Sequence, residues 1–120
     1  MKTVLIIDDD LMAQEIISEW LMEKYKVQVL LASNVGEGLL VLKNDIVDFV
    51  ICDYLMPDGN GKEILNFLKE SNRDSHFIPI IMFSGSLDLQ LLPAFPLIAV
   101  INDKDYDNLF GILERHQCFR

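Results

Sequence analysis

Residues 47–61 read VDFVICDYLMPDGNG, and this stretch decides the fold. Its first six residues are apolar and β-prone except for Asp48, and they lead directly to the carboxylate of Asp53 and a loop rich in Pro, Gly and Asn. A nearly continuous apolar run is typical of a strand buried on both faces, as in a parallel sheet covered by helices. In such sheets, ligands bind beyond the carboxyl ends of the strands. We therefore expect the chemistry of this protein at Asp53.

Strands and helices are expected to alternate on both sides of this stretch. Short β-prone runs predict strands at residues 3–7, 27–31, 47–52, 77–83 and 97–101. Apolar residues at helical spacing predict helices at residues 11–24, 35–42, 61–71 and in a last segment that ends near His116. Pro93 and Pro96 limit any fourth helix, between residues 87 and 96, to about two turns, so this helix is expected to be short or irregular.

Polar residues at the helix ends add local detail. The acids at residues 8–10 are expected to cap the first helix, and Asn60 the third. In the loop at residues 58–61, Gly and Asn are expected to tolerate positive φ. The core-facing side of the first helix is expected to carry Met12, Ile16, Ile17, Trp20 and Leu21.

This alternation predicts one doubly wound α/β domain over residues 1–120. Right-handed crossovers between parallel strands place helices on both faces of the sheet. Five strands in so short a chain favour the flavodoxin-like order 2-1-3-4-5, in which strands 1 and 3 are neighbours at the switch point. Asp8, Asp9 and Asp53 then meet in one crevice, with Ser84 and Lys104 beside them at the ends of strands 4 and 5.

Composition and charge exclude several classes of protein. The chain has 10 Lys and Arg against 19 Asp and Glu, a formal charge of -9, and no basic patch, so direct binding of nucleic acid is not expected. No apolar run approaches the roughly 20 residues of a membrane helix, and the start, MKTVLIIDDD, is too short for a signal peptide. We therefore expect no membrane partner and a cytoplasmic location. The two cysteines, Cys52 and Cys118, predict neither a disulfide framework nor a metal site with short ligand spacing.

The expected crevice suits phosphoryl chemistry. Carboxylates that share a site raise one another's pKa, and a hard divalent cation such as Mg²⁺ (or Mn²⁺) relieves this repulsion. With the cation bound, Asp53 is a candidate nucleophile towards a phosphoryl group, and Lys104 would offset the added negative charge. The candidate hydrogen-bond donors to phosphate oxygens are Ser84 Oγ and the backbone N–H groups of Leu55, Met56 and Gly85.

The ordered set of motifs resembles a response-regulator receiver domain of bacterial two-component signalling, over nearly the whole chain. The set comprises Asp8-Asp9, Asp53 followed by Met56-Pro57 and Gly61, and Ser84-Gly85. The resemblance implies that Asp53 accepts a phosphoryl group from the phosphohistidine of a sensor histidine kinase or phosphotransfer protein, which switches binding to a downstream protein. It also implies that Mg²⁺ is held by Asp9, Asp53, the Leu55 carbonyl and, through water, Asp8, and that Ser84 and Lys104 bind the phosphoryl group.

Two positions depart from the family pattern. Asp105 follows Lys104 where the family usually has proline, which removes a cis X-Pro bond and is expected to add a competing acid near the site. Ile101 stands where the family has an aromatic switch residue, so Ser84 lacks its usual aromatic partner.

Two other functions stay open. The first is a receiver-like protein-binding module that works without phosphorylation, which both departures leave possible. The second is a phosphatase resembling the haloacid dehalogenases, with its nucleophile among residues 8–10, but Met12 stands where that family has Thr or Val and no cap domain fits. A phosphatase would turn over a small phosphate ester, whereas a receiver is labelled once per site and is not expected to be a turnover enzyme. The chain is either a stand-alone receiver or part of a longer protein.

Overall fold

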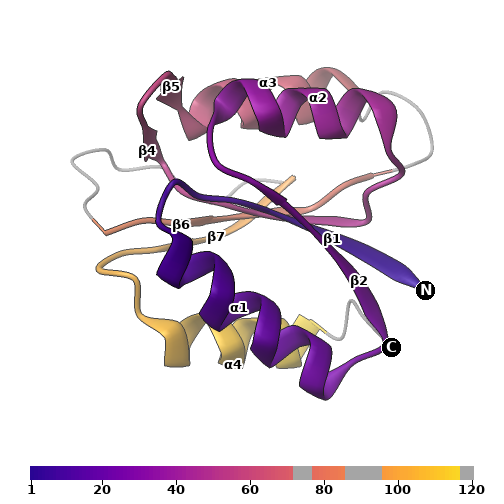
Figure 1. The fold of residues 1–120 in the computed structure, drawn as a ribbon, viewed down its shortest axis with the longest axis vertical. Helices are drawn as coiled ribbons and strands as arrows, with labels where there is room; N and C mark the ends of the chain where they lie inside the picture. The colour runs from indigo at the N-terminus through magenta and orange to yellow at the C-terminus, as the bar shows by residue number, and fades with distance from the viewer. Residues whose placement is uncertain (72–76, 86–95, 117–120) are drawn as a thin grey trace.

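The computed structural model describes residues 1–71, 77–85 and 96–116, which contain a five-stranded parallel sheet (Figure 1). Its strands run in the order β2-β1-β3-β6-β7. Because β6 and β7 are the fourth and fifth strands of this sheet along the chain, the predicted order 2-1-3-4-5 is confirmed. The strands are β1 (Lys2–Ile7), β2 (Val27–Ala32), β3 (Phe49–Cys52), β6 (Ile80–Phe83) and β7 (Leu97–Ile101).

Helices cover both faces of the sheet, as predicted (Figure 1). The helices are α1 (Leu11–Lys24), α2 (Val35–Asn44), α3 (Gly61–Ser71) and α4 (Tyr106–His116). Helices α1 and α4 lie on one face, and α2 and α3 lie on the other. The short helix predicted between residues 87 and 96 falls, except for Pro96, outside the described residues. No helix in the described ranges is both long enough and apolar enough to cross a membrane.

Burial on both faces explains the apolar runs of the central strands. All four residues of β3 and all four of β6 are buried. Alternate residues of β1 serve different layers: Leu5 and Ile7 belong to the core beneath α2 and α3, whereas Val4 and Ile6 belong to the core beneath α1 and α4. A strand between two helical layers has no solvent-facing side, which is why its sequence does not alternate.

Two strands begin later than predicted. Strand β3 begins at Phe49. At the residue before it, the side chain of Asp48 bonds the neighbouring strand: its Oδ2 accepts a 2.8 Å hydrogen bond from Thr3 N–H. Strand β6 begins at Ile80, directly after Pro79, which has no N–H for the ladder.

The core-facing side of α1 differs from the prediction at Met12, which is 67% exposed. Asp10 caps the helix by accepting a hydrogen bond from Met12 N–H at 3.0 Å, and Met12 therefore lies in the first turn, at the open end of the helix. The buried positions of α1 are Ala13, Gln14, Ile17, Ser18 and Leu21. Gln14 and Ser18 are polar, so the spacing of apolar residues does not predict that they are buried.

The loop after Asp53 forms a short antiparallel pair, β4 (Leu55–Met56) with β5 (Gly59–Asn60), which we call the β4–β5 hairpin. None of the residues 58–61 has positive φ, so the tolerance that Gly and Asn offer is not used in this turn. Gly61 is needed for a different reason: a Cβ there would lie 2.5 Å from Met82 Sδ and 3.0 Å from the Asp53 carbonyl oxygen. Close packing of α3 on the sheet therefore selects glycine at this position.

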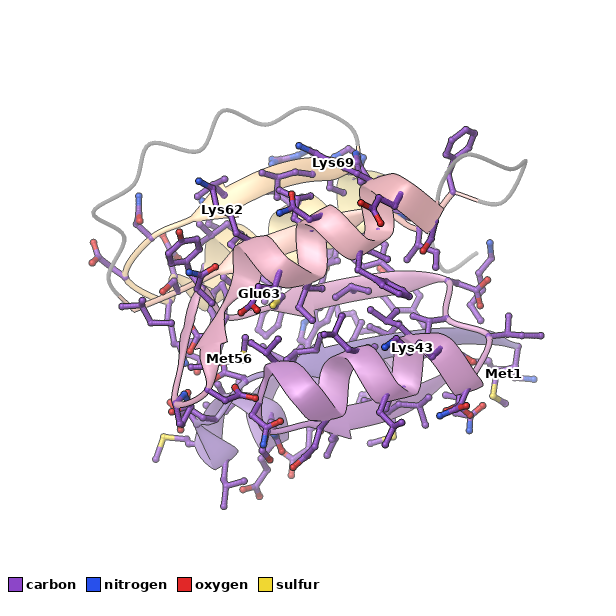
Figure 2. The ribbon with its side chains drawn as sticks, turned by 90° about the horizontal axis from the view of Figure 1, so that it is seen from above. Met1, Lys43, Met56, Lys62, Glu63 and Lys69 are labelled. Carbon is purple, nitrogen blue, oxygen red and sulfur yellow. The ribbon has the colours of Figure 1, made fainter. Side chains whose placement is uncertain are left out.

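Asn60 caps α3 as predicted. Its Oδ1 accepts a hydrogen bond from Lys62 N–H at 3.0 Å, and its own N–H donates to Glu63 Oε2 at 3.2 Å. In the view from above, Met56 and Glu63 lie at the same end of α3, where the β4–β5 hairpin joins the helix (Figure 2). The loop that follows Asp53 is therefore hydrogen-bonded directly to the start of α3.

Candidate functional site

Strand pairing brings the two acidic strand ends together. Strands β1 and β3 are parallel neighbours with Ile7 opposite Cys52, so the next residues, Asp8 and Asp53, leave the sheet side by side. Asp53 N–H donates to the Ile7 carbonyl at 2.8 Å, which continues the ladder to the site. Carboxylate oxygens of Asp8, Asp9 and Asp53 all lie within 4.8 Å of one another. Asp8 and Asp53 are buried and Asp9 is exposed, so the cluster opens to solvent on one side.

Burial makes this cluster electrostatically costly. Burial, together with the charge of Asp8, raises the pKa of the Asp53 carboxyl from 3.8 to about 6, against the opposing effects of Lys104 and of a hydrogen bond from the Ser84 side chain. Burial also raises the pKa of Asp8, although the Asp10 N–H and Lys104 favour its charged form. The cluster therefore favours either protonation or an added cation.

Lys104 supplies a positive charge to this cluster, and its ammonium group pairs with the carboxylate of Asp8. Its Nζ is 2.9 Å from Asp8 Oδ2 and 3.1 Å from Oδ1, and 3.5 Å from Asp10 Oδ2. Burial disfavours the Lys104 ammonium, yet the hydrogen bond to Asp8 and the charges of Asp8, Asp53 and Asp10 leave its pKa above the ordinary value. The role of Asp10 as a partner of Lys104 was missed from the sequence, which indicated helix capping alone.

A tight turn at residues 102–105 directs Lys104 to the cluster. Asp103 and Lys104 have φ of 59° and 46°, the pattern of a type I′ turn, and Asp105 N–H closes it on the Asn102 carbonyl at 3.4 Å. Lys104 N–H donates to the Ser84 carbonyl at 3.0 Å, which joins the ends of β6 and β7.

The expectation that Asp105 competes near the site is wrong. Its Oδ1 accepts a hydrogen bond from Asn108 N–H at 3.1 Å, and its carbonyl accepts one from Leu109 N–H at 3.1 Å. These are the bonds of a residue that caps α4, so the carboxylate is held at the helix start. Within the described ranges, the ion pairs of Lys104 are with Asp8 and Asp10.

The remaining predicted residues lie in the hairpin that follows Asp53 or at the ends of β6 and β7. Ser84 is 2% exposed, and a hydrogen bond from its side chain favours the charged Asp53 carboxylate. A Cβ at Gly85 next to it would meet no atom of the described residues within 4 Å. Leu55 and Met56 follow Asp53 in the β4–β5 hairpin. Ile101 is 1% exposed in the core beneath α1 and α4, and its carbonyl accepts the Ser84 N–H at 3.1 Å.

Two further residues near the site have no obvious signal in the sequence. Gln14 is buried, and its Nε2 donates to the carbonyls of Asp8 at 2.7 Å and Ala32 at 3.2 Å, which holds the ends of β1 and β2 together. Tyr106 lies two residues after Lys104, and its ring packs on Phe83 at 5.2 Å between centroids. An amide in a helix and an aromatic near a helix start are too common to single out from sequence.

The model of one protein family, the response regulator receiver domain, matches residues 4–95. The chain belongs to this family. The match contains the acidic cluster, Asp53 and Ser84 but ends before Lys104. The receiver fold nevertheless continues to the last described helix, because β7 pairs with β6 and α4 packs on the sheet.

Curated relatives agree with this membership. The receiver domain is 35% identical over 86 residues to the transcriptional regulatory protein CpxR of Klebsiella pneumoniae, covering 71% of this chain and 34% of CpxR. It is 32% identical over 83 residues to the two-component response regulator ORR12 of Oryza sativa, covering 68% of this chain and 67% of that protein. The chain thus spans about a third of the length of CpxR and about two thirds of ORR12.

Solved structures share the fold. The response regulator TrrA of Thermotoga maritima, in complex with Mg²⁺ and BeF, superposes with a TM-score of 0.80 at 23% identity and covers 96% of this chain and 98% of TrrA. TrrA in complex with the histidine kinase ThkA gives a TM-score of 0.76, also at 23% identity, and covers 96% of this chain and 97% of TrrA. These likenesses extend the receiver fold over nearly the whole chain.

Proposed function

We propose that this receiver domain accepts a phosphoryl group on Asp53, with Mg²⁺ (or Mn²⁺) bound, from the phosphohistidine of a histidine kinase or histidine phosphotransfer protein. Phosphorylation would then switch the binding of a downstream protein. The observation that carries the proposal is the convergence of oxygens from Asp8, Asp9 and Asp53 within 4.8 Å of one another, with the Lys104 ammonium beside them.

The donor set fits a hard cation. The side chains that converge are all carboxylates, and Mg²⁺ prefers oxygen ligands and keeps several waters. Asp9, Asp53, the Leu55 carbonyl and, through water, Asp8 would hold it. When bound, the cation would neutralise the charge that develops on the transferring phosphoryl group.

The residues around Asp53 have the chemistry for in-line transfer. A carboxylate oxygen of Asp53 attacks phosphorus, the bond to the histidine nitrogen breaks, and its electron pair stays on the imidazole. Lys104, Ser84 Oγ and the N–H groups of Met56 and Gly85 would bind the phosphoryl oxygens. The Ser84 side chain already hydrogen-bonds the Asp53 carboxylate, so its hydroxyl is within reach of the group that would be added there.

Solved relatives support this assignment by analogy. TrrA has been crystallised with Mg²⁺ and BeF, and also with the histidine kinase ThkA. The same fold in this chain presents carboxylates at the ends of the two central strands, where α/β sheets bind ligands. A sensor kinase or phosphotransfer protein is therefore the class of partner that we propose.

Intact mass spectrometry after incubation with Mg²⁺ and acetyl phosphate tests the proposal. The expected product is a single phosphoryl adduct that is absent in the Asp53→Asn variant and in EDTA. A parallel titration with beryllofluoride, a stable mimic of the phosphoryl group, should change the fluorescence of Trp20 or the amide spectrum. If neither an adduct nor a beryllofluoride response is observed while Mg²⁺ binds, the domain is instead a binding module that works without phosphorylation.

A further inference from the structure

Asp58 lies outside the carboxylate cluster, yet its side chain makes two long-range hydrogen bonds. Its Oδ1 accepts from Val35 N–H and its Oδ2 accepts from Gly36 N–H, each at 2.9 Å. The bonds from Gly36 and Val35 lower the pKa of Asp58, so the side chain is a carboxylate at neutral pH. We call this pair of bonds the Asp58 clamp. It joins the β4–β5 hairpin to the first turn of α2, 22 and 23 residues away in sequence.

Helix α2 also has a local cap beside the Asp58 clamp. Asn34 Oδ1 accepts from Glu37 N–H at 2.8 Å, and the Glu37 carboxylate accepts from Ser33 N–H at 3.0 Å and from Asn34 Nδ2 at 3.2 Å, so residues 33–37 form a local cap. Local residues therefore already define where α2 begins. The Asp58 clamp accepts from the N–H groups of Val35 and Gly36, which the local cap does not bond, and the helix dipole favours a carboxylate at this end.

The other side of the Asp58 clamp is the segment that the proposed function uses. Asp58 stands in the turn of the β4–β5 hairpin, where Leu55 pairs with Asn60 and Met56 pairs with Gly59. The base of the hairpin is closed by Gly61 N–H on the Tyr54 carbonyl at 2.6 Å. The hairpin is thus held at its base by the start of α3 and at its tip by α2, and it lies at the end of the α2–α3 layer (Figure 1).

We propose that Asp58 is a positioning residue for the phosphorylation site. By fixing the tip of the β4–β5 hairpin on α2, it sets the position of the Leu55 carbonyl for the metal and of the Met56 N–H for the phosphoryl group. A backbone carbonyl offers a good metal ligand only when its loop is held, because bound Mg²⁺ demands nearly ideal octahedral geometry. This inference rests on the proposed function, since it assigns Leu55 and Met56 the roles given there.

A matched pair of variants separates positioning from simple stabilisation. Asp58→Ala removes the Asp58 clamp, and Glu37→Ala removes the side-chain bonds of Glu37 to Ser33 N–H and Asn34 Nδ2 at the same helix end while leaving the Asp58 bonds intact. Outer residues that orient metal ligands typically change affinity 10- to 100-fold, and we expect Asp58→Ala to weaken Mg²⁺ binding by about tenfold. Glu37→Ala should lower the melting temperature to a similar degree and change Mg²⁺ affinity less than about twofold.

Calorimetric titration with MgCl₂ and thermal unfolding in EDTA give the two readouts. Asp58→Glu, which restores a carboxylate on a longer arm, should recover part of the lost affinity. The inference is overturned if Asp58→Ala binds Mg²⁺ as the wild type does, or if both alanine variants lose affinity in proportion to their loss of thermal stability. A wild-type protein that binds no Mg²⁺ and gives no phosphoryl adduct would instead overturn the proposed function.

Discussion

The Lys104 ammonium lies 2.9 Å from Asp8 Oδ2 in a site that we propose to hold a divalent cation. Lys104 therefore acts as an internal counter-ion for the buried acids. The metal and the lysine neutralise the same carboxylates, so each is expected to weaken the other's interaction with the site.

Replacing Lys104 by methionine should therefore strengthen Mg²⁺ binding while it weakens phosphorylation. Loss of one positive charge near the metal is worth roughly 1 kcal/mol at a partly solvated site, or about a fivefold gain in Mg²⁺ affinity. Phosphorylation by acetyl phosphate should slow, because the variant lacks the ammonium that would bind the phosphoryl oxygens. Titration calorimetry and intact mass report the two effects. Lys43→Met, which makes the same change of charge at an exposed residue of α2, should alter neither.

Asp53→Asn should stabilise the metal-free protein at neutral pH. The pKa of Asp53 is raised from 3.8 to about 6 in the folded state, so the folded state holds a proton that the unfolded state has released between these values. Binding of this proton contributes to the free energy of unfolding fully below pH 3.8, and the contribution is lost as the pH rises to about 6. The advantage of the asparagine variant should therefore grow over this range and level off above it, at about 2 to 3 kcal/mol.

Urea unfolding of both proteins in EDTA at several pH values measures this difference. A difference in free energy of unfolding that stays constant from pH 4 to pH 8 would contradict it. Adding MgCl₂ at pH 8 should stabilise the wild type more than the variant, because bound cation relieves the same repulsion.

Gly61→Ala should destabilise the fold and disturb the β4–β5 hairpin. The new Cβ would lie 2.5 Å from Met82 Sδ and 3.0 Å from the Asp53 carbonyl oxygen, so the buried Met82 side chain must repack and the start of α3 must shift slightly away from the Asp53 backbone. We expect a loss of about 1 to 3 kcal/mol in the free energy of unfolding. The contrasting variant is Gly111→Ala in α4, where a Cβ meets no atom of the described residues within 4 Å. It should gain about 0.5 to 1 kcal/mol from helix propensity, and a similar result for both variants would refute the packing argument.

Gln14→Leu should cost stability although it adds an apolar side chain to a buried position. The Asp8 carbonyl would lose its hydrogen bond from the Gln14 amide, whereas the Ala32 carbonyl would lose one but keep the bond from Asp8 N–H. Buried groups left unsatisfied typically cost about 1 to 3 kcal/mol, and chemical denaturation measures the loss. Glu15→Ala, at an exposed position of the same helix, should stay within about 0.5 kcal/mol of the wild type. A Gln14→Leu protein as stable as the wild type would show that apolar burial outweighs the lost bonds.

The sequence by itself determined the layers of the fold and the place of the site. Apolar runs in β1, β3 and β6 predict strands buried on both faces, and connections through helices make the strands parallel. Once β1 and β3 are neighbours, the acids that follow them must meet, whatever the details of their side chains. Asp8 and Asp53 were predictable for this reason.

Only the tertiary structure decided which polar groups pair with one another. Lys104 lies on Asp8 and Asp10, Asp105 caps α4, Gln14 rather than Met12 is buried, and Asp58 reaches α2. Each of these depends on a helix start, a turn with positive φ, or the reach of one side chain across elements distant in sequence. Periodicity carries no information on such choices, because they are made by hydrogen-bond geometry after the strands and helices have packed.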